Sequence, residues 1–406
     1  MADTDIDPKW PLWLRVGFRF VVCFFTITTL YLAIAHLANL IPFTTPLADW
    51  VQDAGLFAVY RWATERLFGA STVYATTRGF VAYMTTALVG AGAASAIWSL
   101  LDRRRRQYRR AHAVLRIYLR YLLAAVALGY GAAKVIPAQF PPPSLVALVT
   151  PLGEFTRMRL LWHFMGSSTA YIIFTGLIEV AGGLMLLSRR TTPLGALVLA
   201  GAFTNVAVLN FGYEVGVQLN STIYVMIALV LLAPDAARLA AAFCRVSPAT
   251  RESRRVAPWI RRFVKAVVVV LLIAVNFRTA YLVRRDAMLV PALYGIYEVE
   301  AFERDGVVVP PGDRTRWQRL IIAERATAAI QATADGRLNL YGVTDDPQTA
   351  VLTLTGRDQS KQVLTLSYKR EPDGTLEVVG HVEEHLVKAR LRGIDLTQFP
   401  LRRPRR

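Results

Sequence analysis

Seven long apolar stretches constrain this chain more than any other feature. They cover residues 20–41, 79–101, 117–137, 168–188, 192–211, 219–236 and 263–283. An α-helix needs about 20 apolar residues to cross a hydrocarbon core of about 30 Å. Hydrophobic residues make up 54% of the 406 residues and charged residues only 19%, so we expect most of the chain to lie in lipid. We predict an all-α polytopic membrane bundle with seven transmembrane helices.

The basic residues predict how these helices are oriented. Arginines crowd the connection at 102–110, the short link at 189–190 and the connection at 237–262, whereas the alternate connections carry few. Basic connections remain on the cytoplasmic side, next to anionic lipid. We therefore expect a multi-pass protein of the bacterial inner (plasma) membrane, with a cytoplasmic N-terminus and an extracytoplasmic C-terminal domain. Membrane lipids rather than nucleic acid then account for the formal charge of +18.

The sequence pattern changes after residue 291. Short alternating runs occupy 294–303, 317–323, 326–333, 337–343, 350–355, 362–368 and 376–381. Asp-Gly pairs at 305–306, 335–336 and 373–374 favour tight hairpins between strands. We expect seven or eight antiparallel strands in a small all-β domain. A meander or half-sandwich would fit the pattern, and a closed lipocalin-like barrel is the first expectation.

These patterns divide the chain into four parts. Residues 1–110 form an N-terminal two-helix membrane unit, and residues 116–236 form a four-helix membrane unit with an outer loop at 138–166. Residues 237–290 provide a basic linker and the seventh helix. Residues 291–406 form the β-rich domain and a basic tail.

One carboxylate lies in the middle of an apolar stretch. Glu179 shares a helical face with Gly176 and Gly183, where a second helix can approach closely. A charged side chain facing lipid costs several kcal/mol, so the carboxylate is expected to face the interior of the bundle. It serves either as a hydrogen-bonding anchor between helices or as a proton-carrying or headgroup-binding group.

Further polar residues of the predicted helices and of their ends could join Glu179 in one ligand-binding cavity. Lys134, at the end of the third stretch, is expected either to pair with an acid or to extend to the membrane surface. Asn205 and Asn210 lie in the fifth stretch, and Glu214 follows it. Amides in lipid also bond between helices for purely structural reasons.

The remaining motifs exclude several kinds of chemistry. His36 and His163 lie at similar expected depth, but nothing in their spacing requires a haem. His381 and His385 stand as His-Val-Glu-Glu-His, which is not the order of a zinc protease, so no metal site is predicted. The two cysteines form no Cys-x-x-Cys pair, and a dithiol mechanism carried by this chain alone is not expected.

The four-helix unit resembles the DoxX family of integral membrane proteins. The resemblance is carried by Gly131-Ala-Ala-Lys134, Gly176-Leu-Ile-Glu179-Val-Ala-Gly-Gly183 and Arg190-Thr191. A wider run, from Phe164 to Asp235, is similar to a bacterial DoxX-like branch that carries a C-terminal β domain. The resemblance implies a four-helix membrane unit and a bias toward quinone or redox-linked work. The chain departs from the family by three additional helices and the folded domain.

Two functions remain open at the level of sequence. The first is the membrane subunit of a redox system, which binds a quinone or similar amphiphile between helices and receives electrons from a redox partner protein. The second is a non-enzymatic membrane scaffold or transporter-like protein, whose external β domain binds an envelope partner or lipid. The sequence does not decide whether the protein is an enzyme, and it identifies no cofactor beyond the quinone of the first hypothesis.

Overall fold

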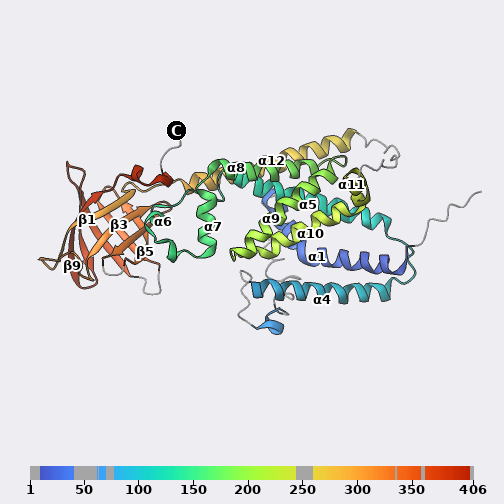
Figure 1. The fold of residues 1–406 in the computed structure, drawn as a ribbon, viewed down its shortest axis with the longest axis horizontal. Coiled ribbons are helices and arrows are strands. Elements are labelled where there is room, and N and C mark those ends of the chain that lie inside the picture. Colours follow the sequence, from blue (N-terminus) through green and yellow to red (C-terminus); the bar gives the residue numbers. More distant parts are fainter. Residues whose placement is uncertain are drawn as a thin grey trace, which may run out of the picture. The chain divides into compact units, whose positions relative to one another are not determined.

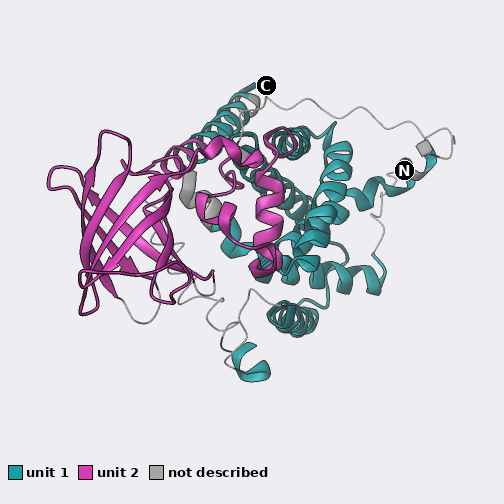
Figure 2. Cartoon of the chain, turned by 60° about the vertical axis from the view of Figure 1, so that its left-hand side comes forward, with its two compact units in different colours: residues 1–136, 173–280 teal, residues 137–172, 281–406 magenta. Residues whose placement is uncertain are grey.

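The computed structural model describes residues 10–40, 62, 64–69, 77–243, 259–333, 336–357 and 362–402. Figure 1 shows their helices and strands in chain order. The chain divides into two compact units, coloured separately in Figure 2. Unit 1 comprises residues 1–136 and 173–280, and unit 2 comprises residues 137–172 and 281–406. Each unit therefore combines segments that are distant in the sequence.

Among the described residues, seven helices are long and apolar enough to cross a membrane. They are α1 (Leu12–Leu40), α4 (Thr77–Leu101), α5 (Arg109–Val135), α8 (Thr169–Leu186), α9 (Thr192–Gly212), α10 (Gln218–Leu232) and α12 (Trp259–Ala287). A 3-10 turn, η3 (Ala233–Asp235), joins α10 to the short helix α11 (Ala236–Phe243), and the sixth membrane span, Gln218–Leu239, includes α10, this turn and the start of α11. Each long helix corresponds to one of the predicted stretches, so the predicted membrane bundle is confirmed.

Helix α5 provides the largest part of the core of unit 1. Leu119, Leu123, Val126 and Leu128 have no exposed surface. They belong to a cluster that also includes buried residues of α1, α4, α9 and α10. Helix α5 begins eight residues before the predicted apolar stretch because Arg109 to Arg116 continue it as a basic, polar turn. Hydropathy predicts the part of a helix in lipid, not its polar end.

The connection between α5 and α8 lies in unit 2. It contains α6 (Leu145–Val149), η2 (Leu152–Glu154) and α7 (Arg157–Gly166). The Ser144 hydroxyl accepts a hydrogen bond from the Ala147 amide at the start of α6, and Thr156 does the same for Arg159 in α7. These are ordinary N-terminal caps. The sequence division placed this loop with the four-helix membrane unit, whereas in the structure it packs with the β domain.

The rest of unit 2 is a closed antiparallel barrel. Its strands are β1 (Gly295–Arg304), β2 (Val307–Val308), β3 (Trp317–Ala323), β4 (Thr327–Ala332), β5 (Leu338–Asp346), β6 (Val351–Gly356), β7 (Val363–Arg370), β8 (Leu376–Val382) and β9 (His385–Gly393). β1 pairs with β3, and from β3 onward each strand pairs with the next; β9 pairs with β1 from Tyr297↔Gly393 to Arg304↔Val387. β2 only extends the edge of β1. The predicted β domain is confirmed as an eight-stranded barrel, with which a lipocalin-like architecture is compatible.

Alternating side chains fill the barrel. Inward-facing residues such as Leu320, Leu352, Leu366, Val378 and Leu391 are fully buried in one cluster. Alternation with a period of two places every second side chain of a strand inside. Side chains therefore occupy much of the interior of this barrel.

The turns follow the predicted Asp-Gly pairs where the structure describes them. Asp305 and Gly306 have φ angles of 52° and 79° between β1 and β2, and Gly374 has 84° between β7 and β8. Positive φ at both central residues is the requirement of a type I′ turn, which matches the twist of the strands. Asp335 of the third pair lies outside the described residues.

Strand β9 was not among the predicted runs, although its residues alternate. The segment His381 to His385 is the tight turn between β8 and β9, where Val382 pairs with His385 and Glu383 has a φ of 56°. The two histidines therefore lie on different strands. The chain reverses between them.

Helix α6 covers part of the outer wall of the barrel. Leu145 and Val146 pack in one buried cluster with Ile296 of β1, Ile321 and Ala323 of β3 and Ala329 of β4. These strand residues point outward and would otherwise expose an apolar patch to water. The connection between the third and fourth membrane helices thus lies on the same side as the barrel that follows the seventh.

Candidate functional site

A buried acid–base pair joins two membrane helices. The Lys134 ammonium near the end of α5 donates to Glu179 Oε1 in the middle of α8. Lys134 is only 5% exposed and Glu179 only 2%. Of the two fates expected for Lys134, the pairing with an acid is confirmed, and extension to the membrane surface is wrong. The ammonium remains inside because a carboxylate there compensates its lost hydration.

Two glycines allow the pair to form. A Cβ atom at Gly131 would lie 2.9 Å from the carbonyl oxygen of Gly176, and one at Gly176 would lie 2.7 Å from the Cβ of Lys134. Real side chains do not tolerate such distances. The helices α5 and α8 can therefore approach closely only with glycine at both positions, which is the small-residue packing expected in lipid. This approach brings Lys134 opposite Glu179.

One oxygen of the carboxylate remains without a partner. Glu179 Oε2 is buried, and no described residue forms a hydrogen bond with it. A buried carboxylate oxygen without a hydrogen bond is costly, and each such group needs a physical explanation. A proton, a water molecule or the donor group of a ligand would each satisfy it.

Two tyrosines connect the Lys134–Glu179 pair with a groove in unit 1. Lys134 Nζ lies 5.9 Å from the ring centroid of Tyr130, one turn earlier on α5. The Tyr130 ring lies 6.2 Å from that of Tyr224 on α10, which is 3% exposed. Tyr224 also lines a groove of about 220 Å³ between α1, α4 and α10, together with Thr28, Tyr31, Tyr83 and Asn220 among others. A continuous set of side chains thus connects this groove with Glu179.

The other predicted ligand residues lie elsewhere. Asn210 is buried near the end of α9, where its Nδ2 donates to Ser221 Oγ of α10 at 3.0 Å and its backbone carbonyl oxygen accepts from Gln218 Nε2. Asn205 and Glu214 are exposed on the surface of unit 1. The five predicted residues therefore do not line one cavity, although Lys134 and Glu179 do come together.

Tyr224 could not be predicted, because nothing in the neighbouring sequence distinguishes it from a core tyrosine. Tyr130 has a weak signal, since it precedes Lys134 by four residues and shares its helical face. Tyr224 lies 90 residues further along the chain on α10. Only the packing of α10 against α5 brings it to Tyr130.

The histidines do not gather into a metal site within the described part of the chain. There, no group of three or more His, Cys, Asp or Glu side chains could hold a metal ion. His163 on α7 packs against the Phe155 ring at 5.1 Å, and burial, aided by the charge of Arg159, lowers its pKa. His385 Nδ1 lies 2.6 Å from the Asp305 carboxylate across the barrel turn. The side chain of His36 lies outside the described residues.

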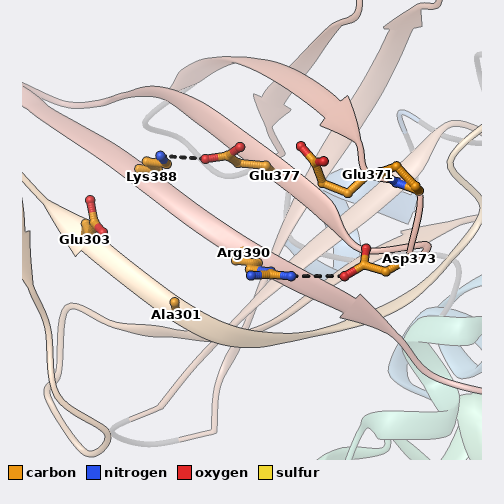
Figure 3. Close-up of a pocket in the computed structure, with 8 residues that line it drawn as sticks. Ala301, Glu303, Glu371, Asp373, Glu377, Lys388 and Arg390 are labelled. Atoms are coloured by element: carbon orange, nitrogen blue, oxygen red, sulfur yellow. Dashed lines mark hydrogen bonds and ion pairs between the residues drawn. The ribbon is translucent and has the colours of Figure 1, made fainter.

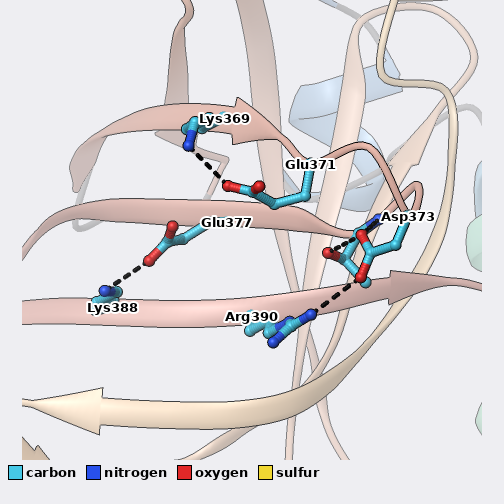
Figure 4. Close-up of polar contacts among 7 residues, drawn as sticks. Lys369, Glu371, Asp373, Glu377, Lys388 and Arg390 are labelled. Atoms are coloured by element: carbon cyan, nitrogen blue, oxygen red, sulfur yellow. Dashed lines mark hydrogen bonds and ion pairs between the residues drawn. The ribbon is translucent and has the colours of Figure 1, made fainter.

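A second polar region covers the outer wall of the barrel. A groove of about 520 Å³ is formed by β1, β8, β9 and the turn before β8. Figure 3 shows residues that line it. Its charged side chains are Glu303, Glu371, Asp373, Glu377, Lys388 and Arg390. Three cross-strand or turn ion pairs organise them, as Figure 4 shows: Lys388 with Glu377, Arg390 with Asp373, and Lys369 with Glu371. The groove is therefore a network of internally paired charges on an exposed wall.

These pairs change the acidity of their members. The hydrogen bond from Lys388 holds the pKa of the Glu377 carboxyl below its ordinary value, and the same pairing raises the pKa of Lys388. Hydrogen bonds from Thr375, and then from Arg390, lower the pKa of Asp373. All three groups remain charged at neutral pH, as an exposed network requires.

Comparison with known proteins gives one informative relative. No protein-family model and no solved structure matches the chain. A Bacillus subtilis (strain 168) protein, described as the uncharacterized protein YwoB, is 35% identical over 109 residues. The aligned segment covers 26% of this chain and 67% of the relative. On this similarity the chain belongs to the same protein family as YwoB.

Proposed function

We propose that this protein is an integral membrane protein that binds the polar head of a quinone-class amphiphile between its helices. The buried carboxylate of Glu179, with one oxygen that lacks a partner among the described residues, carries the proposal. An ionisable residue inside a membrane bundle is expensive and is retained where it serves a ligand or a proton. In the proposal, Glu179 and Lys134 exchange protons with the bound head.

The groove beside Tyr224 is the proposed entrance. It opens between α1, α4 and α10 and is lined mainly by apolar residues, with Thr28, Tyr31, Tyr83, Asn220 and Tyr224 as its polar groups. A quinone ring presents two carbonyl oxygens that accept hydrogen bonds and an apolar face and tail. Hydroxyl and amide donors in an apolar groove suit such a head. Tyr224 and Tyr130 would then connect the head with Lys134.

The resemblance to the DoxX family also supports the proposal of quinone binding. The residues that carry it, Gly131, Lys134, Gly176 and Glu179, are those that form the buried pair and its close helix contact. Under this proposal the protein is the membrane subunit of a redox system, and a separate redox partner protein supplies the electrons. The helices would span the inner membrane, with the N-terminus on the cytoplasmic side and the barrel on the extracytoplasmic side.

The first experiment is mass spectrometry of the full chain purified in mild detergent, with an absorption spectrum of the same sample. We expect stoichiometric quinone in the wild-type protein. Tyr224→Phe removes one donor from the groove and should lower the bound quinone by about tenfold, which corresponds to one hydrogen bond of about 1.4 kcal/mol. The Glu179→Gln variant should insert into the membrane normally, but it should lose any activity that depends on proton exchange with the bound head.

The matched control is Glu214→Gln, which changes an exposed carboxylate on the turn between α9 and α10. It should retain the wild-type amount of quinone. Wild-type protein that carries only bulk phospholipid, in a sample whose spectrum is clean, would refute the quinone proposal. Normal proton-coupled activity in Glu179→Gln would remove Glu179 from the mechanism.

A second candidate function rests on a specific observation. Asn210 bonds to Ser221 of α10, and Asn205 and Glu214 are exposed, so these polar residues do not converge on Glu179. This favours a non-enzymatic scaffold or transporter-like protein, whose barrel binds an envelope partner or lipid. Cross-linking from a cysteine placed at Thr365, an exposed position of β7, to one reproducible envelope protein in intact cells would support this alternative. The absence of any cross-linked protein would count against the partner.

A further inference from the structure

One buried arginine of the membrane bundle lacks the partners that the others have. Arg120 on α5 is 7% exposed, and its Nε is buried without a hydrogen bond to any described residue. Its guanidinium lies 4.8 Å from the ring centroid of Tyr121. A ring face gives a cation only part of the energy that its lost hydration costs. The side chain therefore needs a further acceptor.

Two other buried arginines show what a satisfied site looks like. Arg19 on α1 donates to the Tyr108 hydroxyl at 2.9 Å and to the Asp102 carbonyl at 2.6 Å. Arg316 in unit 2 donates to three backbone carbonyl oxygens, of Val309, Val299 and Glu300. Both side chains are as buried as Arg120. The comparison indicates that Arg120 is built to meet a group that is not part of the described chain.

Arg120 faces a pocket that is rich in positive charge. The pocket has a volume of about 190 Å³, and Arg116, Arg120, Arg189 and Thr192 line it with Asp235. Lys265 on α12 interacts electrostatically with both Arg120 and Arg189. Four cations thus stand against one carboxylate among the described residues of this site. Asp235 is already shared between Arg116 at 3.8 Å and Arg238 at 3.6 Å.

The position of the pocket in the bundle indicates the kind of anion. It lies at the beginning of α5, at the link between α8 and α9 and at the end of α10. These are the ends from which the basic connections at 102–110, 189–190 and 237–262 leave. The apolar parts of these helices lie on one side of the pocket, and the basic residues of the connections at 102–110 and 189–190 lie on the other. A phosphate at this depth lies where lipid headgroups lie.

We propose that Arg116, Arg120 and Arg189 form a binding site for the phosphate of an anionic phospholipid, with Arg120 as the central ligand. Arginine donates two parallel hydrogen bonds to phosphate oxygens, which would satisfy the buried Nε. The apolar side chains of Ile117 and Leu231 at the pocket wall would contact the start of the acyl chains. The proposal is independent of the Glu179 site, which lies at a different depth of the bundle.

The test uses the full chain, delipidated in detergent and titrated with dioctanoyl phosphatidylglycerol, with dioctanoyl phosphatidylcholine and with inorganic phosphate. Native mass spectrometry counts the bound lipid. Phosphatidylglycerol should bind in a one-to-one complex that is weaker by at least about tenfold in Arg120→Gln, since a hydrogen bond to a charged group is lost. The wild-type protein should bind phosphatidylcholine at least as weakly as Arg120→Gln binds phosphatidylglycerol. Arg104→Gln, at an exposed position of the 102–110 connection, is the matched control and should leave binding unchanged.

A second measurement separates a ligand role from a structural one. Without lipid, Arg120→Gln should raise the melting temperature, because the substitution relieves the repulsion between Arg120 and Lys265. With saturating phosphatidylglycerol the order should reverse, because only the wild type gains the lipid. A melting temperature that falls equally in both conditions would assign Arg120 a structural role and overturn the proposal. Inorganic phosphate that binds as tightly as the lipid would identify a site for free phosphate, and failure of both to bind would also overturn the proposal.

Discussion

Acid–base pairs occur in two very different regions of this molecule. In the membrane bundle, the side chains of Lys134 and Glu179 are 6% and 3% exposed. On the barrel wall, those of Lys388 and Glu377 are 51% and 29% exposed, and those of Arg390 and Asp373 are 54% and 52% exposed. The chemical groups are the same in both regions. Their surroundings differ in how much water remains around each charge.

This difference changes what a pair contributes. In water, an ion pair gains little, because solvent and salt screen the charges. In the bundle, each charge has lost its hydration, so removal of one partner leaves the other uncompensated. The barrel tolerates many charges on its wall because none depends on a single partner. The bundle holds its pair in place with the Gly131–Gly176 contact.

The largest expected effect comes from removing one member of the buried pair. Glu179→Ala should destabilise the full chain by about 3–5 kcal/mol, because the Lys134 ammonium would remain buried and unpaired. Unfolding in mixed micelles with increasing denaturing detergent measures this free energy. The double variant Lys134→Met/Glu179→Leu should recover most of the loss, because no charge is then buried. A double variant as unstable as Glu179→Ala would show that the pair itself, not the orphaned charge, matters.

A smaller effect is expected from separating the two helices. Gly176→Ala places a Cβ 2.7 Å from that of Lys134 and should cost about 1–3 kcal/mol through overpacking. Gly201→Ala is the control, since a Cβ at that position meets no atom within 4 Å. The control should be neutral or slightly stabilising, because alanine favours a helix. Equal losses in both variants, measured in the same micelle titration, would contradict the close contact.

The exposed pair should show much weaker coupling. A double-mutant cycle of Lys388→Met and Glu377→Gln in the full chain should give a coupling energy far below that of Lys134 with Glu179. The coupling should also disappear in high salt, whereas the buried coupling should remain. Hydrogen exchange of the peptides of β8 and β9 measures the local stability. Salt-independent coupling on the barrel wall would break the comparison between the two regions.

The smallest effect concerns acid pH at the barrel wall. The pKa of Asp373 is lowered by hydrogen bonds from Thr375 and then from Arg390. A carboxyl with a lowered folded-state pKa stabilises the fold above its unfolded pKa of about 4, and this contribution is lost as the pH falls through the lowered value. Asp373→Asn should therefore reduce the loss of protection of the turn before β8 on acidification. Hydrogen exchange at pH 6 and at pH 3 measures this protection in both proteins. An equal loss of protection in Asp373→Asn and in the wild type would contradict the prediction.

The predictability of the fold differs between its parts. All seven membrane helices could be predicted, because a run of about 20 consecutive apolar residues is sufficient to indicate a helix that spans the hydrocarbon core. Strands β1 and β3 to β8 could be predicted from alternation and from turns such as Asp373-Gly374. Strand β9 could not be found as easily, since it begins at His385, only two residues after β8 ends at Val382. The closure of β9 onto β1 joins residues about 90 positions apart, such as Phe302 and Ala389.

The candidate site was predictable only in part. Glu179 is conspicuous because a carboxylate in an apolar helix is rare, and Gly176 indicates the face on which it lies. Several acidic residues were possible partners of Lys134, and the sequence alone could not identify which of them it pairs with. Asn205 and Asn210 lie in the last turns of α9 and Glu214 follows it, but position along a helix does not fix the direction of a side chain around its axis. Ligand binding by these five residues stays a prediction.

The sequence by itself determined the number of membrane helices, the position of the β domain and the presence of a buried carboxylate. These properties follow from contiguous residues, whose hydropathy and periodicity act locally. The tertiary structure decided the partner of Lys134, the closure of the barrel, the packing of α6 on its wall and the isolation of Arg120 among other cations. Each of these depends on which surfaces meet across long stretches of chain. Such choices are settled by packing and by the cost of an unpaired buried charge, which no local pattern records.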